Sequence, residues 1–291
     1  MKYEEFDDYI LVTDCSDFDI KQTLECGQVF RYKVRDFGYT IYSLDQKADI
    51  YCQNDTIKIF TNNTKYFVKY FDFCTNYDRI KSSLEAYPEL KESIRFGSGI
   101  RILRSDPLEM IIEFIISQNN NIPRIKSIIE KICECYGENK GDYYAFPTLK
   151  QLESIPREFF TSIKCGYRDS YLYESIQMIA RGDVDIYGII NMTTHESRIE
   201  LMKLKGVGRK VADCILLFGY GKTDVFPTDT WVVKAYNHIY NKQETNAIKI
   251  SQYLVDRFGG LSGYAQQYLF YNMRENKIGE KLWKRITLHY Y

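Results

Sequence analysis

The stretch Leu204-Lys-Gly-Val-Gly-Arg-Lys-Val-Ala-Asp-Cys214 decides the fold of the second half of this chain. Gly206 and Gly208 stand between two segments with helical patterns, and we expect both to allow a tight turn with positive φ and close backbone approach. The second helix is expected to begin near Arg209, where its first N–H groups lack acceptors within the helix and its dipole is positive. Gly206, Val207 and Gly208 therefore predict a turn whose N–H groups bind a phosphate, although an ordinary helix–turn–helix has the same pattern.

Lys210 is the residue of this stretch with a chemical use of its own. It falls in the first turn of the predicted helix, where the dipole disfavours an ammonium and Arg209 adds repulsion. Both effects, together with any burial, are expected to lower the pKa of Lys210. A neutral amine is a nucleophile that can form a Schiff base. The alternative is a surface lysine that contacts phosphate.

Asp229 is the second candidate for chemistry. It follows Val225-Phe-Pro-Thr228 and precedes a predicted helix over Thr230–Tyr240, so its position is typical of an N-cap. A carboxylate there that faced a sugar would also stabilise positive charge at C1′ as the glycosidic bond breaks, or accept a proton from the lysine. A plain cap is the alternative.

Outside these motifs the sequence predicts an α+β chain, in which an antiparallel β domain precedes a helical domain. Residues 1 to about 75 indicate strands, because Tyr39–Ser43 and Thr56–Phe60 alternate and are rich in β-branched and aromatic residues. Turn residues separate the strands at Gly38, Asn54-Asp55 and Asn62-Asn63. We expect domains over residues 1–100 and 101–291.

From about residue 78 the apolar residues have helical spacing. Asp106-Pro107 has the pattern of a cap followed by proline at the first helical position. Paired helices joined by the Gly turn are expected at about 198–218. Further helices are expected over Ile122–Cys135, Tyr167–Ala180, Arg209–Phe218, Asn246–Phe258 and Tyr264–Arg274.

Composition and charge exclude some classes of protein. With 45% hydrophobic and 15% aromatic residues, the chain is not of the disordered type. Residues 1–60 hold 7 Lys/Arg against 12 Asp/Glu, and residues 197–291 hold 15 against 8, which suits a polyanion bound by one face and equally suits ordinary surface charge. No apolar run approaches the roughly 18 residues of a membrane helix, and the acidic N-terminus is unlike a signal peptide. We expect a cytoplasmic protein that does not bind membranes, with its 8 Cys as free thiols.

The Gly-Val-Gly-Arg-Lys-Val-Ala-Asp-Cys string followed by Pro227-Thr-Asp229 resembles the helix–hairpin–helix DNA glycosylase superfamily and, in detail, its 8-oxoguanine DNA glycosylase family. The resemblance extends over nearly the whole chain. It implies a bifunctional glycosylase and AP lyase that excises 8-oxoguanine from duplex DNA, preferably opposite cytosine. It also implies Lys210 as the nucleophile, assisted by Asp229, with no cofactor, double-stranded DNA containing oxidised guanine as the partner, and a monomeric enzyme.

Such an enzyme extrudes its target nucleotide, fills the hole and reads the flipped base. Ser117-Gln-Asn-Asn-Asn-Ile-Pro-Arg124 resembles the family's strand-separating loop, which implies that Asn119 occupies the vacated space and Arg124 donates to the estranged cytosine. Cys165-Gly-Tyr167-Arg168 resembles the segment whose Tyr wedges beside that base and whose Arg bonds to it. The alternatives are a polar linker between helices and a Tyr packed at a helix start.

Gly263-Tyr-Ala-Gln-Gln-Tyr-Leu-Phe270 resembles the base-reading helix of the family. Gln266 and Phe270 are at i and i+4 and so share one face; the resemblance implies that Gln266 binds the guanine edge while Phe270 stacks on the base, opposite Cys214. Gln267 makes the register ambiguous by one residue, and Phe270 favours Gln266. Simple core packing is the alternative for Phe270.

Two further positions follow from the resemblance. The segment Glu25–Arg31 contains Gly27, whose carbonyl would accept the N7–H of 8-oxoguanine, whereas guanine would leave that carbonyl unsatisfied at a cost of about 1–3 kcal/mol. Trp231 stands where the family often has a His that contacts phosphate. Indole donates one hydrogen bond and carries no charge, so either a weaker phosphate contact or simple packing is expected there.

Competing interpretations differ in the residues that they need. An alkylated-purine glycosylase shares the hairpin and the Asp but uses no lysine nucleophile, and a non-catalytic hairpin module needs neither Lys210 nor Asp229. An endonuclease III-like enzyme carries a four-Cys cluster near its C-terminus, and no Cys follows Cys214. Cys133-x-Cys135 is poorly spaced for zinc, so no metal site is expected. Backbone carbonyls of the hairpin could hold a monovalent cation without any side-chain signature.

Overall fold

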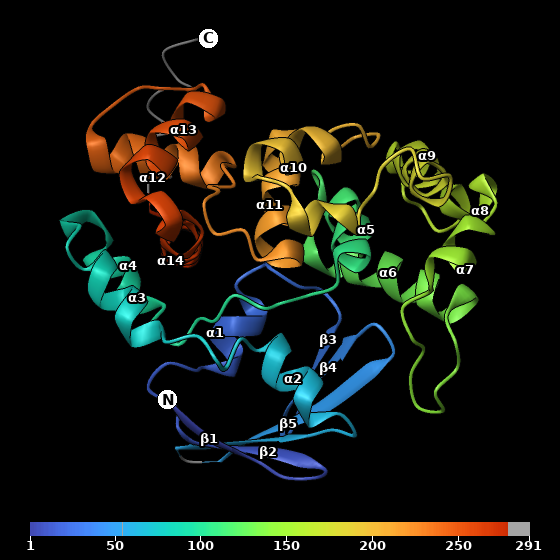
Figure 1. The fold of residues 1–291 in the computed structure, drawn as a ribbon, viewed down its shortest axis with the longest axis horizontal. Coiled ribbons are helices and arrows are strands. Elements are labelled where there is room, and N and C mark those ends of the chain that lie inside the picture. Colours follow the sequence, from blue (N-terminus) through green and yellow to red (C-terminus); the bar gives the residue numbers. More distant parts are fainter. Residues whose placement is uncertain (54, 279–291) are drawn as a thin grey trace.

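The computed structural model describes residues 1–53 and 55–278 and has the α+β architecture that the sequence predicts (Figure 1). Six strands form one antiparallel sheet in the order β1-β2-β6-β5-β4-β3, at the bottom of Figure 1, and most of the helices lie above it. The predicted strands over Tyr39–Ser43 and Thr56–Phe60 are confirmed, whereas Asn54 of the expected turn lies outside the described residues. The strands are β1 (Lys2–Glu5), β2 (Tyr9–Asp14), β3 (Tyr32–Arg35), β4 (Gly38–Ser43), β5 (Gln46–Gln53) and β6 (Thr56–Phe60).

Buried and exposed residues alternate along the strands, so that one face of the sheet packs against the core. Ile10 lies opposite Ile59 across β2 and β6, Ile59 lies opposite Ile50 across β6 and β5, and all three are completely buried. Their neighbours Tyr51 and Phe60 are exposed on the other face. This period-2 pattern is the one expected of antiparallel strands with one face against the core.

The expectation of strands to about residue 75 is wrong for two segments. Helix α1 spans Ile20–Glu25 and helix α2 spans Thr64–Tyr70. Each is capped by a side chain, since Asp19 accepts from the Gln22 N–H and Asn63 accepts from the Tyr66 N–H. Asn63 therefore acts as an N-cap rather than as a plain turn residue, and helices this short show too few turns for their period to be recognised in the sequence.

The predicted helices after residue 105 are all present, with ends within two residues of those expected. The hairpin expected at about 198–218 corresponds to α10 and α11. The helices are α3 (Tyr77–Leu84), α4 (Lys91–Phe96), α5 (Pro107–Ser117), α6 (Ile122–Tyr136), α7 (Leu149–Glu153), α8 (Arg157–Ser162), α9 (Arg168–Ala180), α10 (Thr194–Leu201), α11 (Arg209–Tyr220), α12 (Thr230–Tyr240), α13 (Ala247–Phe258) and α14 (Ser262–Glu275).

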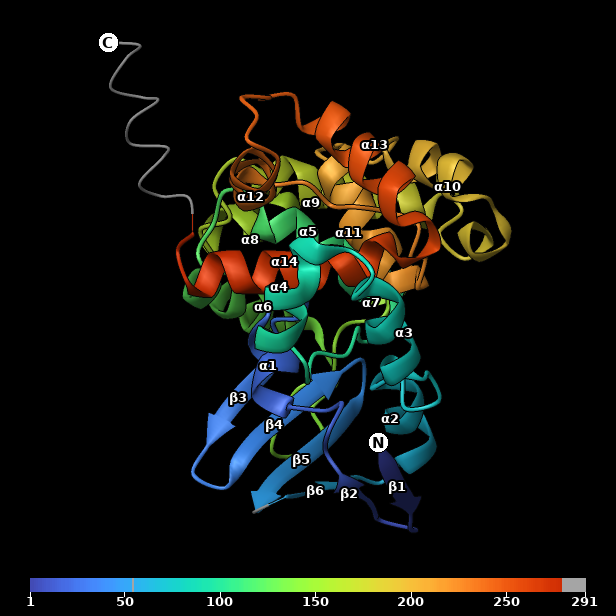
Figure 2. The same ribbon diagram turned by 90° about the vertical axis from the view of Figure 1, so that its left-hand side faces the viewer.

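The two parts of the chain pack closely against each other. Helix α14 lies beside α4 and above α1 (Figure 2), and Asn272 donates to the hydroxyl of Ser93 on α4 at 3.1 Å. Helix α4 belongs to the first predicted domain by sequence but packs against the last helix described. Residues 279–291 of the second predicted domain lie outside the described residues. The end of the first domain at residue 100 stays a prediction.

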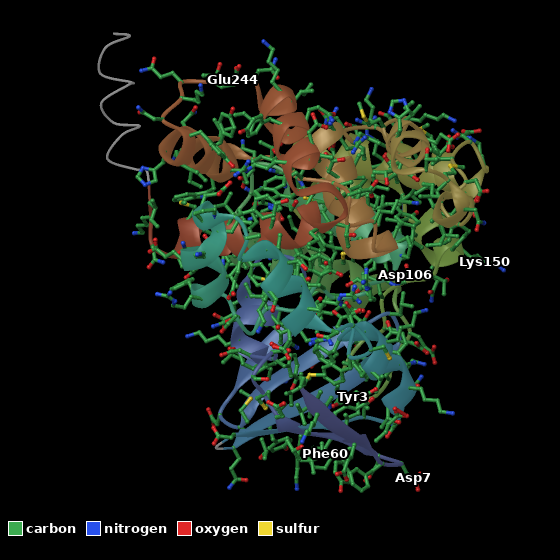
Figure 3. All side chains as sticks on the ribbon, turned by 60° about the vertical axis from the view of Figure 1, so that its left-hand side comes forward. Tyr3, Asp7, Phe60, Asp106, Lys150 and Glu244 are labelled. Carbon is green, nitrogen blue, oxygen red and sulfur yellow. The ribbon has the colours of Figure 1, made fainter. Side chains whose placement is uncertain are left out.

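Helix α5 enters the helical body at the junction with the sheet. Figure 3 shows Asp106, its N-cap, at this junction, while Phe60 and Asp7 lie at the far end of the sheet and Glu244 lies at the opposite end of the molecule. Asp106 accepts from the backbone N–H of Leu108 and Glu109, as predicted for a cap. Among the described helices, none combines the length and the apolar character that crossing a bilayer requires.

Candidate active site

The hairpin turn between α10 and α11 has one glycine in a left-handed conformation. Gly206 has φ +77°, and a Cβ there would overlap the ring of Tyr171, so only glycine fits. Gly208 has φ −89°, which corrects the expectation of positive φ at both glycines. Nothing lies within 4 Å of where a Cβ on Gly208 would be, so its backbone is open to close approach. Between them, Val207 is buried and anchors the turn in the core.

The N-terminus of α11 keeps its first N–H groups available. Gly208 is its N-cap and has no side chain with which to bond them. Behind the turn, Asp213 is completely buried and ties the two helices together through Arg198 of α10 at 2.6 Å. Arg209 also turns toward Asp213, at 3.9 Å. A rigid helix start with unused donors is suited to holding a DNA phosphate.

Lys210 is half-buried on α11, with its Nζ 5.6 Å from the centre of the Phe114 ring on α5. Cys214, one turn along α11, raises the pKa of Lys210 most, and Asp229 raises it further, while burial lowers it. The expectation of a lowered pKa is therefore wrong. The reason is local, because the effects of Cys214 and Asp229 together outweigh the effect of burial.

Cys214 and Asp229 both raise the pKa of Lys210, and Cys214 has the larger effect. Burial raises the pKa of the Cys214 thiol to about 11, while the charge of the neighbouring Lys210 lowers it. Lys210 and Asp229 come from different elements, because Lys210 lies at the start of α11 and Asp229 is the N-cap of α12. The fold thus brings an ammonium and a carboxylate to one site.

Asp229 caps α12 with a single oxygen. Its Oδ1 accepts from the N–H of Trp231 at 2.9 Å and from that of Val232 at 3.0 Å. Within the described part of the chain, Oδ2 accepts no hydrogen bond, so the cap and a chemical role are compatible. Trp231 is half-buried with the Nζ of Lys234 at 4.7 Å from its ring centre, and a phosphate contact from its indole stays a prediction.

Helix α14 brings Gln267 and Phe270 to the loop that carries Gly27. Gly27 has φ +89°, and a Cβ there would lie 3.6 Å from Cε1 of Phe270. Gln267 donates to the carbonyl of Cys26 at 3.3 Å, so its side chain is used to hold this loop. Gln266 is also buried, but its Oε1 has no hydrogen-bond partner among the residues described. A buried acceptor without a partner is costly and points to a ligand with a donor, which supports Gln266 rather than Gln267 as the base reader.

The strand-separating candidates lie together on two adjoining segments. Asn119 is exposed with φ +45°, between α5 and α6. Tyr167, 50% exposed, donates from its hydroxyl to the Gln118 carbonyl at 3.2 Å. Arg124 is exposed and donates to the Lys164 carbonyl at 2.7 Å. The exposed Asn, Tyr and Arg side chains thus share one edge of the helical body.

Arg168, which is expected to hydrogen-bond to the estranged base, makes most of its hydrogen bonds within the protein. It is buried, and its guanidinium donates to the backbone carbonyls of Gln118, Asn119 and Cys165. Four of its five N–H groups are used in this way. Nε donates to Gln118, Nη1 donates to Cys165, and Nη2 donates to both Gln118 and Asn119. The main task of Arg168 in this structure is to shape the loop that carries Asn119.

The sequence interpretation did not identify the residues that hold other site residues in place. Arg198 and Asp213 lock the hairpin, and Arg274 contacts the Gly27 loop from α14. The spacing of Arg274 one turn beyond Phe270 was the available signal for that residue. All eight cysteines are free, as predicted, and no group of three or more His, Cys, Asp or Glu within residues 1–53 and 55–278 is arranged to hold a metal ion.

Known proteins match the chain along most of its length. Residues 10–111 match the family described as 8-oxoguanine DNA glycosylase, N-terminal domain, and residues 112–258 match the HhH-GPD superfamily of base excision DNA repair proteins. A probable N-glycosylase/DNA lyase of Methanothermobacter thermautotrophicus is 32% identical over 217 residues, which cover 66% of this chain and 69% of that protein.

Solved structures agree with these matches. The 8-oxoguanine glycosylase/lyase of Clostridium acetobutylicum, in complex with duplex DNA containing cytosine opposite 8-oxoguanine, superposes with a TM-score of 0.90 at 38% identity and covers 96% of this chain and 99% of that one. The 3-methyladenine DNA glycosylase of Archaeoglobus fulgidus superposes with a TM-score of 0.74 at 20% identity, covering 92% of this chain and 99% of that one. The second likeness shows a common fold alone.

Proposed function

Because the chain belongs to the HhH-GPD superfamily of base excision DNA repair proteins and carries the N-terminal domain of its 8-oxoguanine DNA glycosylases, we propose that it excises 8-oxoguanine from duplex DNA and then cleaves the strand as an AP lyase. The observation that carries the proposal is that the charge of Asp229 acts on Lys210, although the two residues come from separate elements. A DNA-binding module or a glycosylase without a covalent intermediate has no use for an amine beside a carboxylate.

Because its pKa is raised, Lys210 is an ammonium at neutral pH and has to lose a proton before it attacks. The Oδ2 of Asp229 is the acceptor that this chain offers. The nitrogen of Lys210 then forms a bond to C1′, the bond from C1′ to the base breaks, and the base leaves with the electron pair and is protonated. The nitrogen then loses a second proton, and the C1′–O4′ bond breaks with O4′ taking up a proton, which gives an imine. Removal of a proton from C2′ forms the C2′–C3′ double bond and breaks the C3′–O bond, so that the 3′ phosphate leaves with the electron pair.

Damage recognition depends on residues from both parts of the chain. The carbonyl of Gly27 accepts the N7–H that 8-oxoguanine carries and guanine lacks. The unpartnered Oε1 of Gln266 accepts from the donor edge of the base, which supplies the partner that this buried oxygen lacks. Phe270 stacks on one face of the base and Cys214 contacts the other.

Duplex DNA is held by the two exposed parts of the helical body. The N–H groups of Gly206, Gly208 and the start of α11 bind the backbone of the damaged strand, whereas the N–H of Val207 donates to the Leu204 carbonyl at 3.1 Å. Asn119 fills the space that the base leaves, Tyr167 wedges beside the estranged base, and Arg124 donates to it, which favours cytosine. Arg168 supports this loop and offers its one remaining N–H. The enzyme acts as a monomer, and its free thiols suit the reducing cytoplasm.

Borohydride trapping on a duplex that contains 8-oxoguanine opposite cytosine tests the chemistry. The wild-type chain is expected to form a covalent complex, and Lys210→Gln is expected to form none and to release no base. Lys205→Gln, at an exposed lysine of the same hairpin, is the matched control and should be trapped like the wild type. Full base release by Lys210→Gln would refute the proposed nucleophile.

A further inference from the structure

Arg274 links the base-reading helix to the loop that carries Gly27. It lies on α14 one turn beyond Phe270, and Gln266 lies one turn before Phe270, so the three side chains share one face of the helix. The Nη2 of Arg274 donates to the Glu25 carbonyl at 2.6 Å. Its guanidinium carbon lies 5.3 Å from the centre of the Phe270 ring. One side chain therefore contacts both the loop and the stacking ring.

Gly27 is packed directly against this pair. A Cβ on Gly27 would lie 3.0 Å from Nη1 of Arg274 and 3.6 Å from Cε1 of Phe270. The carboxylate that pairs with Arg274 is that of Glu275 on the same helix, with the Nε of Arg274 2.9 Å from its Oε1. The bond to Glu25 therefore joins the guanidinium to the loop backbone rather than to a loop carboxylate, and it spans almost the whole sequence.

We propose that Arg274 is a positioning residue for damage recognition, which sets the distance between the Gly27 carbonyl and the Phe270 ring. The proposal rests on the proposed function, in which the Gly27 carbonyl accepts from the edge of the flipped base while Phe270 stacks on its face. Arginine suits the task because its planar guanidinium stacks on a ring and donates within its own plane at the same time. A lysine ammonium donates to a carbonyl but offers no flat surface to the ring.

A purely structural role for Arg274 would give a different result. Base release requires the distance between Gly27 and Phe270 to be correct, because the hydrogen bond to N7–H is made only at the right separation. Cleavage of a preformed abasic site uses Lys210 and the DNA contacts but has no base to read. Loss of positioning therefore reduces base release and spares strand cleavage, whereas loss of folding reduces both.

The experiment measures both rates under single-turnover conditions on two duplexes, one with 8-oxoguanine opposite cytosine and one with an abasic site at the same position. Arg274→Met is expected to slow base release about tenfold to a hundredfold, the effect of losing a charged hydrogen bond. Its cleavage of the abasic duplex should stay within about threefold of the wild type. Arg274→Lys should release base at an intermediate rate, since it keeps the donor and loses the stack.

Arg257→Met is the matched control, because Arg257 also pairs with a carboxylate and lies over aromatic rings, on α13. It should leave the ratio of the two rates unchanged. Equal loss of both rates in Arg274→Met, or no loss of base release, overturns the proposal. If Arg274→Met does not fold, an unchanged ratio in Arg274→Lys overturns it. A wild-type chain that cleaves the abasic duplex but releases no 8-oxoguanine refutes the proposed function itself. The results from the variants bear only on the role of Arg274.

Discussion

Gln266 and Gln267 are neighbours on α14, and replacing each by methionine is predicted to change stability in opposite directions. Their side chains are 5% and 2% exposed. Gln267 donates to the Cys26 carbonyl at 3.3 Å, whereas the Oε1 of Gln266 has no partner within the described part of the chain. Methionine has a similar length and lacks a strong acceptor, so it changes the hydrogen bonding more than the packing.

The magnitude follows from the cost of a buried polar atom without a partner, about 1–3 kcal/mol. Gln266→Met removes such an atom, so the free energy of unfolding should rise by about 1–2 kcal/mol. Gln267→Met removes a bond that is made, so the free energy of unfolding should fall by about 1 kcal/mol. Substitution of a buried residue usually destabilises a protein, and the expected gain at Gln266 is therefore a strict test.

Urea unfolding followed by circular dichroism measures both changes, and an unchanged m value shows that the variants unfold from equally compact states. Release of 8-oxoguanine should fall about tenfold or more in Gln266→Met, because the base edge loses its partner. If Gln266→Met lowers stability as much as Gln267→Met and keeps full base release, Gln266 is an ordinary core residue and the reasoning from its unpartnered oxygen is wrong.

Three further predictions concern the nucleophile, the hairpin and the loop. Because the pKa of Lys210 is raised, its neutral fraction should increase as pH rises from 7 to about 9, and the single-turnover rate of base release should increase with it. Asp229→Asn should move this rise to lower pH and should slow the reaction at every pH. Gly206→Ala should lower the free energy of unfolding in urea by about 2 kcal/mol or more, because its Cβ has no space and φ is +77°. Gly208→Ala should lower it by less than about 1 kcal/mol and should mainly weaken duplex binding. Arg168→Met should lower the unfolding free energy by about 2 kcal/mol or more, since three backbone carbonyls lose a charged donor; a change below about 0.5 kcal/mol would contradict its loop-shaping role.

Elements whose signals are local could be predicted from the sequence. The cap at Asp106 with Pro107 and the cap at Asp229 each act within a single helical turn, so the starts of α5 and α12 were predicted at the correct residues. The Gly206–Lys210 motif likewise describes a turn and the helix that follows it. The short helices α1 and α2 were missed because they offer too few turns for a period to show.

The sequence by itself therefore determined the α+β class, the hairpin and the identity of Lys210 and Asp229 as candidates, because residues close in sequence create those signals. Only the tertiary structure decided which of two adjacent glutamines has a free acceptor, in which direction the pKa of Lys210 moves and what the guanidinium of Arg168 holds. Each of these depends on groups from distant elements and on their burial. Charge interactions and desolvation act through space, so their balance at a site is settled only when the chain has packed.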